Sequence, residues 1–307
     1  MHAPGESVVV GLGQASFDYL GRLSSFPAED EKVELAAIEG QCGGPASTAL
    51  VALTRLGIKT SFLGSISDDL SGTEILKGLE QEGVDATFLK VRPGYTSQLA
   101  FIAITQESGK RTIFWHRGST PPLRKEEVDL SVFPIAQVLH LDGLMIEASL
   151  EAARQARKRG MKVVMDAGTL REGSLDLLSQ VHTVIASERF AAPLLAGEAS
   201  PEKALKALSR FGPQEVIITL GSRGSVGLNG VHVIHQEAVP IRAMDTTGAG
   251  DVYHGAYIYG MLRGWPMSEC MRFASIAAAL KCREPGARKG IPRLEEILTF
   301  RRGESAR

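Results

Sequence analysis

The sequence predicts an α/β fold in which a mostly parallel sheet is flanked by helices on both faces. Short β-rich segments alternate with segments of helical apolar spacing along most of the 307 residues. Helices that separate consecutive apolar strands make the strands run parallel and cover both faces of the sheet. Glycine-rich and acidic turns follow several predicted strands, at the edge where open sheets bind ligands. We therefore expect a single domain over 1–307 with its site at that edge.

The first two core elements illustrate this pattern. The segment VVVGLG, from Val8 to Gly13, is β-rich, ends in glycine and is typical of a buried strand. Over 45–57, PASTALVALTRLG places apolar residues at the i, i+3, i+4, i+7 spacing of a helix face. Pro45 suits the first turn of that helix and Gly57 its C-terminal cap.

The alternation then continues toward residue 224. A helix is expected over 71–83, where Ser71 and Glu74 have the spacing of a capping box. The remaining elements are predicted as strands over 60–66, 138–143, 161–168, 181–187 and 214–224, and as helices over 147–160 and 200–212.

Two segments, at about 20–40 and 96–118, lack helical periodicity. The second is typical of a hairpin, with strands SQLAFIAIT and RTIFWHR around the turn QESGK at 106–110. Strands inserted near the ends of core strands predict a small β-sheet lid over the carboxyl edge of the core. Because the lid strands carry apolar faces such as LAFIAI, we also expect a homodimer formed through the lid.

Composition excludes several functional classes. The chain is 44% hydrophobic and 22% charged with a formal net charge of −1, which offers no general attraction for nucleic acid or an anionic membrane. Cys42, Cys270 and Cys282 are too scattered for a disulfide framework or a paired-ligand zinc site. The start lacks the features of a secretory signal, and no apolar run approaches the ~20 residues that span a bilayer. We therefore expect a cytoplasmic protein.

The most specific motif is DTTGAGD at 245–251, directly before an apolar segment with helical spacing. Gly248, Ala249 and Gly250 can direct consecutive backbone N–H groups at one point, where the helix N-terminus adds positive partial charge. Such a point stabilises an anion, and a transferring phosphoryl group is the obvious candidate. Asp251 could then take the proton of an attacking hydroxyl. An aspartate N-cap would explain Asp251 alone but not the glycines.

Two further turns suggest a site for a polyol. Asp18 follows the first strand, where its carboxylate could accept hydrogen bonds from sugar hydroxyls, although a turn aspartate bonded to its own backbone is an equal alternative. Gly43 and Gly44 precede the helix at 45–57 and would allow a ligand to approach the backbone closely. A simple glycine turn before a helix is common and, for this pair taken alone, is the favoured explanation. The segment GLGQASFD lacks the third glycine of a dinucleotide fingerprint, so a dehydrogenase is disfavoured.

The segment ITLGSRGSVGL joins two predicted strands and could contact phosphate. Gly221 and Gly224 can present backbone N–H groups, and Arg223 could add positive charge. A plain hairpin turn explains the segment equally well. The chain contains no P-loop and no protein-kinase motifs, so phosphates would be held by backbone groups and a helix N-terminus.

Together, CGGPASTALVALTRLG at 42–57 and DTTGAGDVYHGAYIYGML at 245–262 resemble the two signature regions of the ribokinase-like (PfkB) carbohydrate kinases. The resemblance covers essentially the whole chain and looks closest to the sulfofructose kinase and ketohexokinase branches. It implies a ribokinase-like α/β core with a β-lid, and transfer of the γ-phosphoryl group of ATP, accompanied by Mg²⁺, to a hydroxymethyl group of a monosaccharide (ketose, pentose or related sugar).

The resemblance also implies roles for individual residues. Asp251 would be the catalytic base, with Gly248, Ala249 and Gly250 as the anion hole. By position, the substrate site would comprise Asp18, Gly43, Gly44 and Thr48. The nucleotide site would comprise Thr219, Gly221, Arg223, Gly224 and Gly286. Asp245 and Thr247 would bind a monovalent cation (K⁺).

The sequence departs from the family pattern at two places. Thr48 stands where the first signature often has asparagine, which leaves the sugar open. The N-x-x-E motif, which helps to place Mg²⁺ and phosphate, reads Ser187-Glu188-Arg189-Phe190, although Glu188 could substitute as a metal ligand. A nucleoside kinase of the same fold remains an alternative. A non-catalytic sugar or nucleotide sensor is another, which the intact GAGD disfavours and the altered motif weakly favours.

Overall fold

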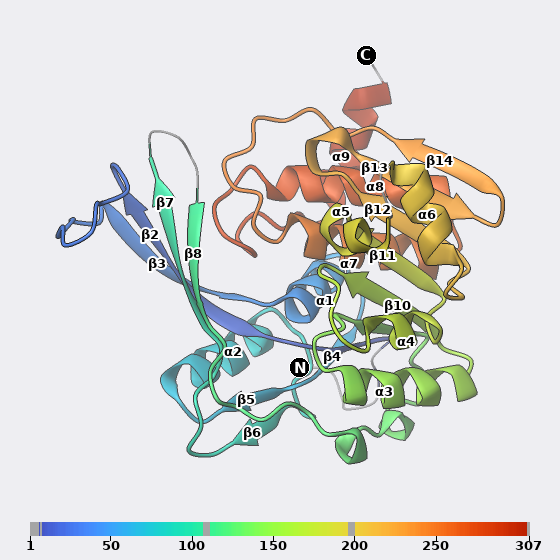
Figure 1. Cartoon of the computed structure of the whole chain (residues 1–307), viewed down its shortest axis with the longest axis horizontal. Coiled ribbons are helices and arrows are strands. Elements are labelled where there is room, and N and C mark those ends of the chain that lie inside the picture. Colours follow the sequence, from blue (N-terminus) through green and yellow to red (C-terminus); the bar gives the residue numbers. More distant parts are fainter. Residues whose placement is uncertain (1–5, 7, 107–110, 196–199, 306–307) are drawn as a thin grey trace.

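The computed structural model describes residues 6, 8–106, 111–195 and 200–305. An eight-stranded sheet runs through the core in the order β14-β13-β12-β11-β10-β9-β1-β4 (Figure 1). From β4 to β12 neighbouring strands pair in parallel, whereas β13 and β14 add antiparallel at one edge. The mostly parallel sheet is therefore confirmed. Its strands are β1 (Val9–Leu12), β4 (Thr60–Leu63), β9 (Val138–Leu141), β10 (Lys162–Ala167), β11 (Thr183–Ser187), β12 (Glu215–Thr219), β13 (Ser225–Asn229) and β14 (His232–Gln236).

Helices cover both faces of this sheet, as predicted, because successive strand residues point to opposite sides. Val9 packs in one apolar cluster and its neighbour Val10 in the other. The Val9 side is covered by α1 (Pro45–Arg55), α2 (Leu70–Gln81), α7 (Ala249–Leu262), α8 (Met267–Lys281) and α9 (Leu294–Ser305). The Val10 side is covered by α3 (Ile146–Lys158), α4 (Ser174–Leu178), α5 (Glu188–Ala191) and α6 (Pro201–Ser209).

A second sheet projects from the core as the lid (Figure 1). It has the order β3-β2-β7-β8, with β2 at Ser16–Leu23, β3 at Ala37–Gly43, β7 at Leu99–Thr105 and β8 at Arg111–His116. The hairpin of β7 and β8 agrees with the sequence, although 107–110 of its predicted turn lie outside the described residues. The first lid strand begins at Ser16, earlier than about residue 20, because the chain passes directly from core strand β1 into the lid.

Three local expectations need correction. Helix α2 is capped by Asp69, whose carboxylate accepts the N–H of Gly72 at 2.8 Å, so the predicted capping box of Ser71 and Glu74 is wrong. The predicted strand over 60–66 divides into β4 and β5 (Ser65–Ser67), and β5 pairs with β6 (Lys90–Arg92) instead of the core sheet. The strand predicted over 214–224 ends at Thr219 and is followed by a 3₁₀ turn, Gly221–Arg223.

The three cysteines are buried and free in this structure. Among the helices of the described ranges, none combines the length and apolar character that a membrane crossing requires.

Candidate active site

The DTTGAGD turn leads directly into helix α7, which begins at Ala249. Gly248 is the N-cap residue and has a φ of 76°, a left-handed conformation that side chains disfavour. A Cβ atom on Gly248 would also lie 2.8 Å from the carbonyl oxygen of Ala287. Asp251 stands in the first turn of the helix and is not its N-cap, which excludes the simple capping explanation. The helix N-terminus and the Asp251 carboxylate therefore face the same region.

Asp251 belongs to a group of three acidic side chains. Asp142 directly follows β9, and Asp166 is in the neighbouring strand β10, near the carboxyl end. Burial, followed by the negative charges of Asp166 and Asp142, raises the pKa of Asp251 well above its usual range. Burial also raises the pKa of Asp142 to about 7. Three carboxyl groups that disfavour each other's ionisation would gain from a cation or a proton between them.

A cavity of about 530 Å³ lies beside the start of α7. It brings together Thr219, Gly221 and Gly224 with Ala249 and Gly250 of the GAGD motif. The remaining lining residues, which give it a mainly apolar wall, are Ser222, Ala238, Val239, Pro240, Ile241, Ala243, Thr246, Tyr253, Ser275, Ala278, Ala279 and Cys282. The cavity thus combines two glycine-containing turns with a mainly apolar wall that suits a flat ring.

Two residues predicted for the nucleotide site do not line this cavity. The guanidinium of Arg223 forms an ion pair with Glu188, and both side chains are more than half exposed. Gly286 has a φ of 79° and donates its N–H to the carboxylate of Asp245 at 2.7 Å. Gly286 therefore stabilises the DTTGAGD turn through Asp245.

The predicted sugar site contains two buried polar atoms that lack hydrogen-bond partners among the described residues, Oδ1 of Asp18 and Oγ1 of Thr48. Asp18 is 7% exposed, and burial raises its pKa to about 6. A Cβ atom on Gly43 would lie 2.3 Å from Oδ2 of Asp18, and one on Gly44 would lie 2.5 Å from the carbonyl of Gln14. Both glycines are therefore required by the close approach of neighbouring atoms.

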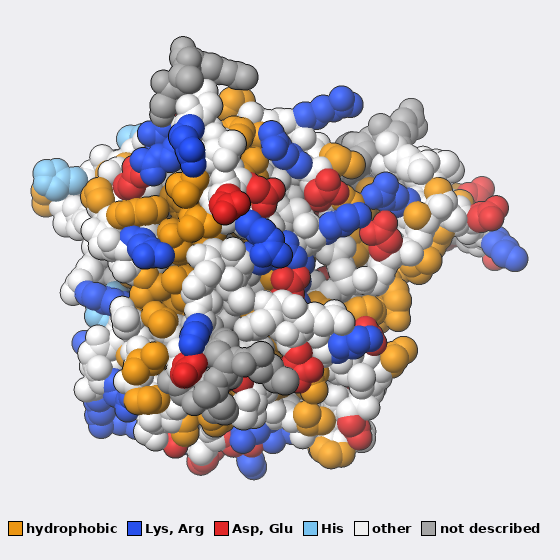
Figure 2. All heavy atoms as spheres, turned by 180° about the vertical axis from the view of Figure 1, so that it is seen from behind, with side chains coloured by type: hydrophobic (Ala, Val, Ile, Leu, Met, Phe, Trp, Pro, Cys, Tyr) orange, Lys and Arg blue, Asp and Glu red, His pale blue; other side chains and the backbone are white. Residues whose placement is uncertain are grey.

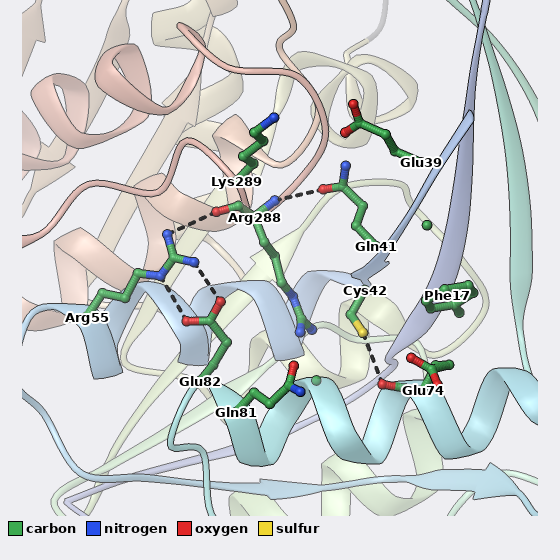
Figure 3. A pocket seen from close by; sticks show the side chains of 12 residues that line it. Phe17, Glu39, Gln41, Cys42, Arg55, Glu74, Gln81, Glu82, Arg288 and Lys289 are labelled. Carbon is green, nitrogen blue, oxygen red and sulfur yellow. Dashed lines mark hydrogen bonds and ion pairs between the residues drawn. The ribbon is translucent and has the colours of Figure 1, made fainter. Parts of the chain in front are cut away.

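Arg288 links the predicted sugar and catalytic residues. Its side chain, only 5% exposed, donates through Nη2 to the carbonyl of Gly43 at 3.3 Å and to Oγ of Ser47 at 2.9 Å. The Arg288 charge acts to lower the pKa of both Asp18 and Asp251. These two carboxylates are therefore within the field of one guanidinium. Figure 3 shows Arg288 reaching down between α1 and α2 into a second cavity of about 340 Å³.

The residues expected to bind a monovalent cation are already engaged. Oδ1 of Asp245 accepts hydrogen bonds from the N–H and hydroxyl of Thr247 and from Arg111, and Oδ2 accepts the N–H of Gly286. The carbonyl oxygen of Asp245 accepts a hydrogen bond from the ammonium of Lys281 at 3.0 Å. With two positive side chains in contact with Asp245, these residues do not fit an additional K⁺ ion.

The residue predicted to bind magnesium, Glu188, lies outside the cavity beside α7. Glu188 is exposed and forms an ion pair with Arg223, which does not line this cavity either. Within the described ranges, no group of three or more His, Cys, Asp or Glu side chains is arranged to hold a metal by itself. Asp166 acts electrostatically on Asp251 and lies 3.6 Å from Nε2 of His254, and its single carboxylate suits a magnesium ion that is bound mainly through substrate phosphates.

Sequence reasoning missed several residues at this site, namely Asp142, Asp166, Arg288, Lys281 and Arg111. Asp142 and Asp166 could have been found, because both stand at the carboxyl ends of strands that the sequence predicts. Arg288, Lys281 and Arg111 act through tertiary contacts that leave no local pattern in the sequence.

The chain is similar to known proteins along nearly its whole length. The family model for the pfkB family carbohydrate kinases matches residues 7–294. A ribokinase of Haemophilus influenzae is 30% identical over 94% of this chain and 96% of its own length. A nucleoside kinase of Methanothermobacter thermautotrophicus is 24% identical, with 92% of each chain covered.

Solved structures show the same fold. The crystal structure of a putative ribokinase from Agrobacterium tumefaciens has a TM-score of 0.88 and 29% identity, covering 99% of this chain and 100% of its own. A ribokinase of Arabidopsis thaliana in complex with ribose and ATP has a TM-score of 0.83 and 24% identity, with 97% and 99% covered. This chain belongs to the pfkB family of carbohydrate kinases and is a phosphotransferase with an alcohol group as acceptor.

Proposed function

We propose that this kinase transfers the γ-phosphoryl group of ATP to a hydroxymethyl group of a monosaccharide, such as a ketose or pentose. One observation carries the proposal: the first turn of α7 both lines the 530 Å³ cavity, through Ala249 and Gly250, and carries Asp251. A nucleotide in that cavity would direct its phosphates at the helix N-terminus, next to a carboxylate able to act as a base.

The chain would contribute positioning and electrostatics more than covalent chemistry. The N–H groups of Gly248 and Gly250 would form the anion hole for the transferring phosphoryl group, whereas the predicted donor Ala249 gives its N–H to the carbonyl oxygen of Thr246 at 3.2 Å. Asp251 would accept the proton of the attacking hydroxyl. Its raised pKa favours this role, because a base is most effective when its pKa approaches the working pH.

Sugar binding at the other side of the site explains the unpartnered atoms of Asp18 and Thr48. A buried acceptor or hydroxyl without a partner is costly, and sugar hydroxyl groups would supply the missing hydrogen bonds. The lid also contributes Trp115. Asp18 pairs with Ala100 on the next strand, and Ala100 pairs with Trp115, so Asp18 and Trp115 lie on the same face of the lid sheet. An aromatic ring on that face suits an apolar face of a sugar.

Magnesium would be held mainly by the ATP phosphates, with Asp166 as the protein carboxylate beside it, and its charge would offset the negative charge of the phosphates. Potassium is not part of the proposed site, because Arg111 and Lys281 already contact Asp245.

A nucleoside acceptor is the second candidate. Trp115 is 47% exposed, and although the guanidinium of Arg117 lies 5.3 Å from its ring centroid, a base could stack on the exposed part of the ring. The likeness to a nucleoside kinase is compatible with this acceptor as well.

A substrate panel decides between the candidates. Purified protein is incubated with Mg²⁺-ATP and sets of ketoses, pentoses, hexoses and nucleosides, and ADP release is measured beside ATP binding by calorimetry. Turnover with a sugar and none with nucleosides supports the proposal, whereas the reverse supports a nucleoside kinase. ATP binding without turnover on any acceptor would instead favour a sensor.

We also propose that the protein is cytoplasmic and forms a homodimer in which the two lids are in contact. Ile38 and Phe114 are 58% and 53% exposed and, by strand register, lie on the lid face opposite to Asp18. Seen from behind, the projecting lid carries hydrophobic side chains along its length (Figure 2). Analytical ultracentrifugation of the wild type and of Phe114→Asp tests this; a wild-type monomer would refute it.

A further inference from the structure

Lys281 is a fully buried lysine at the end of helix α8. Its ammonium donates a hydrogen bond to the carbonyl oxygen of Asp245, the first residue of the DTTGAGD turn, at 3.0 Å. Lysines are almost never fully buried unless a partner offsets the loss of water. The negative charges of Asp245 and Asp251 both act favourably on Lys281. The ammonium is thus hydrogen-bonded to the turn that forms the predicted anion hole and is attracted by the charge of the predicted catalytic base.

The oxygen atoms around this ammonium are occupied by hydrogen-bond donors. The carboxylate of Asp245 is held by Thr247, Arg111 and Gly286 at 2.7–3.0 Å. A monovalent cation binds by replacing its water shell with several protein oxygens, so it would have to displace these donors. It would also approach Lys281 and Arg111, which carry the same charge, in a poorly hydrated region where repulsion is strong.

We propose that Lys281 is an internal cation that positions the DTTGAGD turn, and that this kinase therefore does not require a monovalent metal ion. The positive charge of Lys281 stabilises the turn conformation in which Gly248 and Gly250 aim their N–H groups at the phosphoryl group. The inference rests on the proposed function for its catalytic consequence. Its structural consequence, a turn held by a built-in charge, can be measured without any sugar.

The first experiment titrates wild-type protein with KCl against tetramethylammonium chloride at constant ionic strength. Melting temperature and ADP binding are followed without sugar, and phosphoryl transfer with any substrate found in the panel. We expect all three to stay flat, with changes below about twofold in the affinity and the rate, which is within the scatter of a salt effect. An increase of about tenfold or more in ADP affinity or rate with K⁺ would overturn the proposal.

The second experiment removes the charge. Lys281→Met keeps much of the side-chain volume, and we expect a lower melting temperature and phosphoryl transfer reduced by about 10²-fold, as for loss of a group that orders an anion hole. In Lys281→Ala, which leaves space, K⁺ or ethylammonium should restore part of the melting temperature and the rate. Wild-type behaviour of Lys281→Met, or no response of Lys281→Ala to either cation, would contradict the proposal.

Controls separate a charge effect from general destabilisation. Lys289→Met removes an exposed lysine from the loop that follows α8 and should leave the cation response and the rate unchanged. Lys281→Arg retains the charge and should keep the K⁺-independence, even where its bulk lowers the melting temperature. A Lys281→Arg variant that becomes K⁺-dependent would show that the charge is not the operative feature. Because melting and ADP binding need no acceptor, they remain decisive if no sugar is phosphorylated.

Discussion

The carboxylate of Asp245 accepts the backbone N–H of Gly286 at 2.7 Å, and this hydrogen bond joins two loops that are 41 residues apart. The first loop continues into the GAGD turn, and the second continues into Arg288, which contacts Gly43. One chain of contacts therefore connects the anion hole with the glycine turn of the predicted sugar site. Distortion at either loop should affect both sites.

The substitution Gly286→Ala should damage this connection. Gly286 has a φ of 79°, and a Cβ atom there would lie 1.7 Å from the Gln41 side chain. We expect a loss of at least about 1–3 kcal/mol in the free energy of unfolding, because both the backbone strain and the clash oppose the folded state. Urea denaturation measures this loss, and phosphoryl transfer should fall with it.

Gly303→Ala provides the matched control. Gly303 is in helix α9, where a Cβ atom would meet no atom within 4 Å. Alanine should be neutral there or stabilise the helix by up to about 1 kcal/mol. If Gly286→Ala behaved like Gly303→Ala, the two loops would not depend on each other.

Arg288→Lys should weaken sugar binding more than catalysis. The guanidinium of Arg288 reaches Gly43 and Ser47 through one nitrogen, and lysine lacks the planar group that holds this geometry. We expect a loss of about 1–3 kcal/mol in unfolding free energy and a larger change in KM for the sugar than in kcat. Steady-state kinetics at saturating ATP measures the two separately. A fall in kcat with an unchanged KM for the sugar would place Arg288 in the chemical step instead.

The sequence predicted the core of this fold well because each core element has a local cause. Strand β1 and helix α1 follow from an apolar run and from a helical face that starts at Pro45 and stops before Gly57. The cap of α2 was wrong because Asp69 and Ser71 are both good capping residues, and only tertiary contacts decide between them. The carboxylate of Asp69 also accepts the N–H of Ser97, a residue 28 positions away.

The same distinction applies to the candidate site. The GAGD turn could be predicted because glycines and an aspartate before a helix have a direct physical meaning. Lys281 could not, because a lysine at the end of an apolar helix is normally read as a solvated, dipole-compensating residue. Its complete burial depends on how α8 packs against the Asp245 loop. The part that sequence does not reveal is thus mainly the buried charge that supports the turns.

The pH dependence of phosphoryl transfer should report on the carboxyl group of Asp251. Its pKa is raised above the ordinary value of 3.8 by burial and then by the charges of Asp166 and Asp142. A base is lost when it is protonated, so kcat/KM should fall as the pH is lowered, with its acid limb above pH 3.8. Asp166→Asn removes one of these charges, so the limb should move to lower pH. The measured quantity is the position of the limb and not the height of the plateau.

The control for this experiment is Asp176→Asn, which removes an exposed carboxylate from helix α4. Its acid limb should coincide with that of the wild type because solvent screens the charge. A limb that moves equally in both variants would show that net charge, and not proximity to Asp251, sets the pKa.

The sharpest test of mechanism is Asp251→Asn, which keeps the shape of the side chain and removes its ability to accept a proton. Asp251 stands in the first turn of α7 but is not its cap, since Gly248 holds that position, so the helix should still form. We expect kcat to fall by about 10²–10⁴-fold while ATP binding stays largely intact, because the cavity and the anion-hole N–H groups remain. Rapid-quench kinetics on the confirmed substrate measures the first effect and calorimetry the second. Unchanged turnover would exclude Asp251 as the base. If ATP binding and turnover were both lost, the carboxylate would act in nucleotide binding instead.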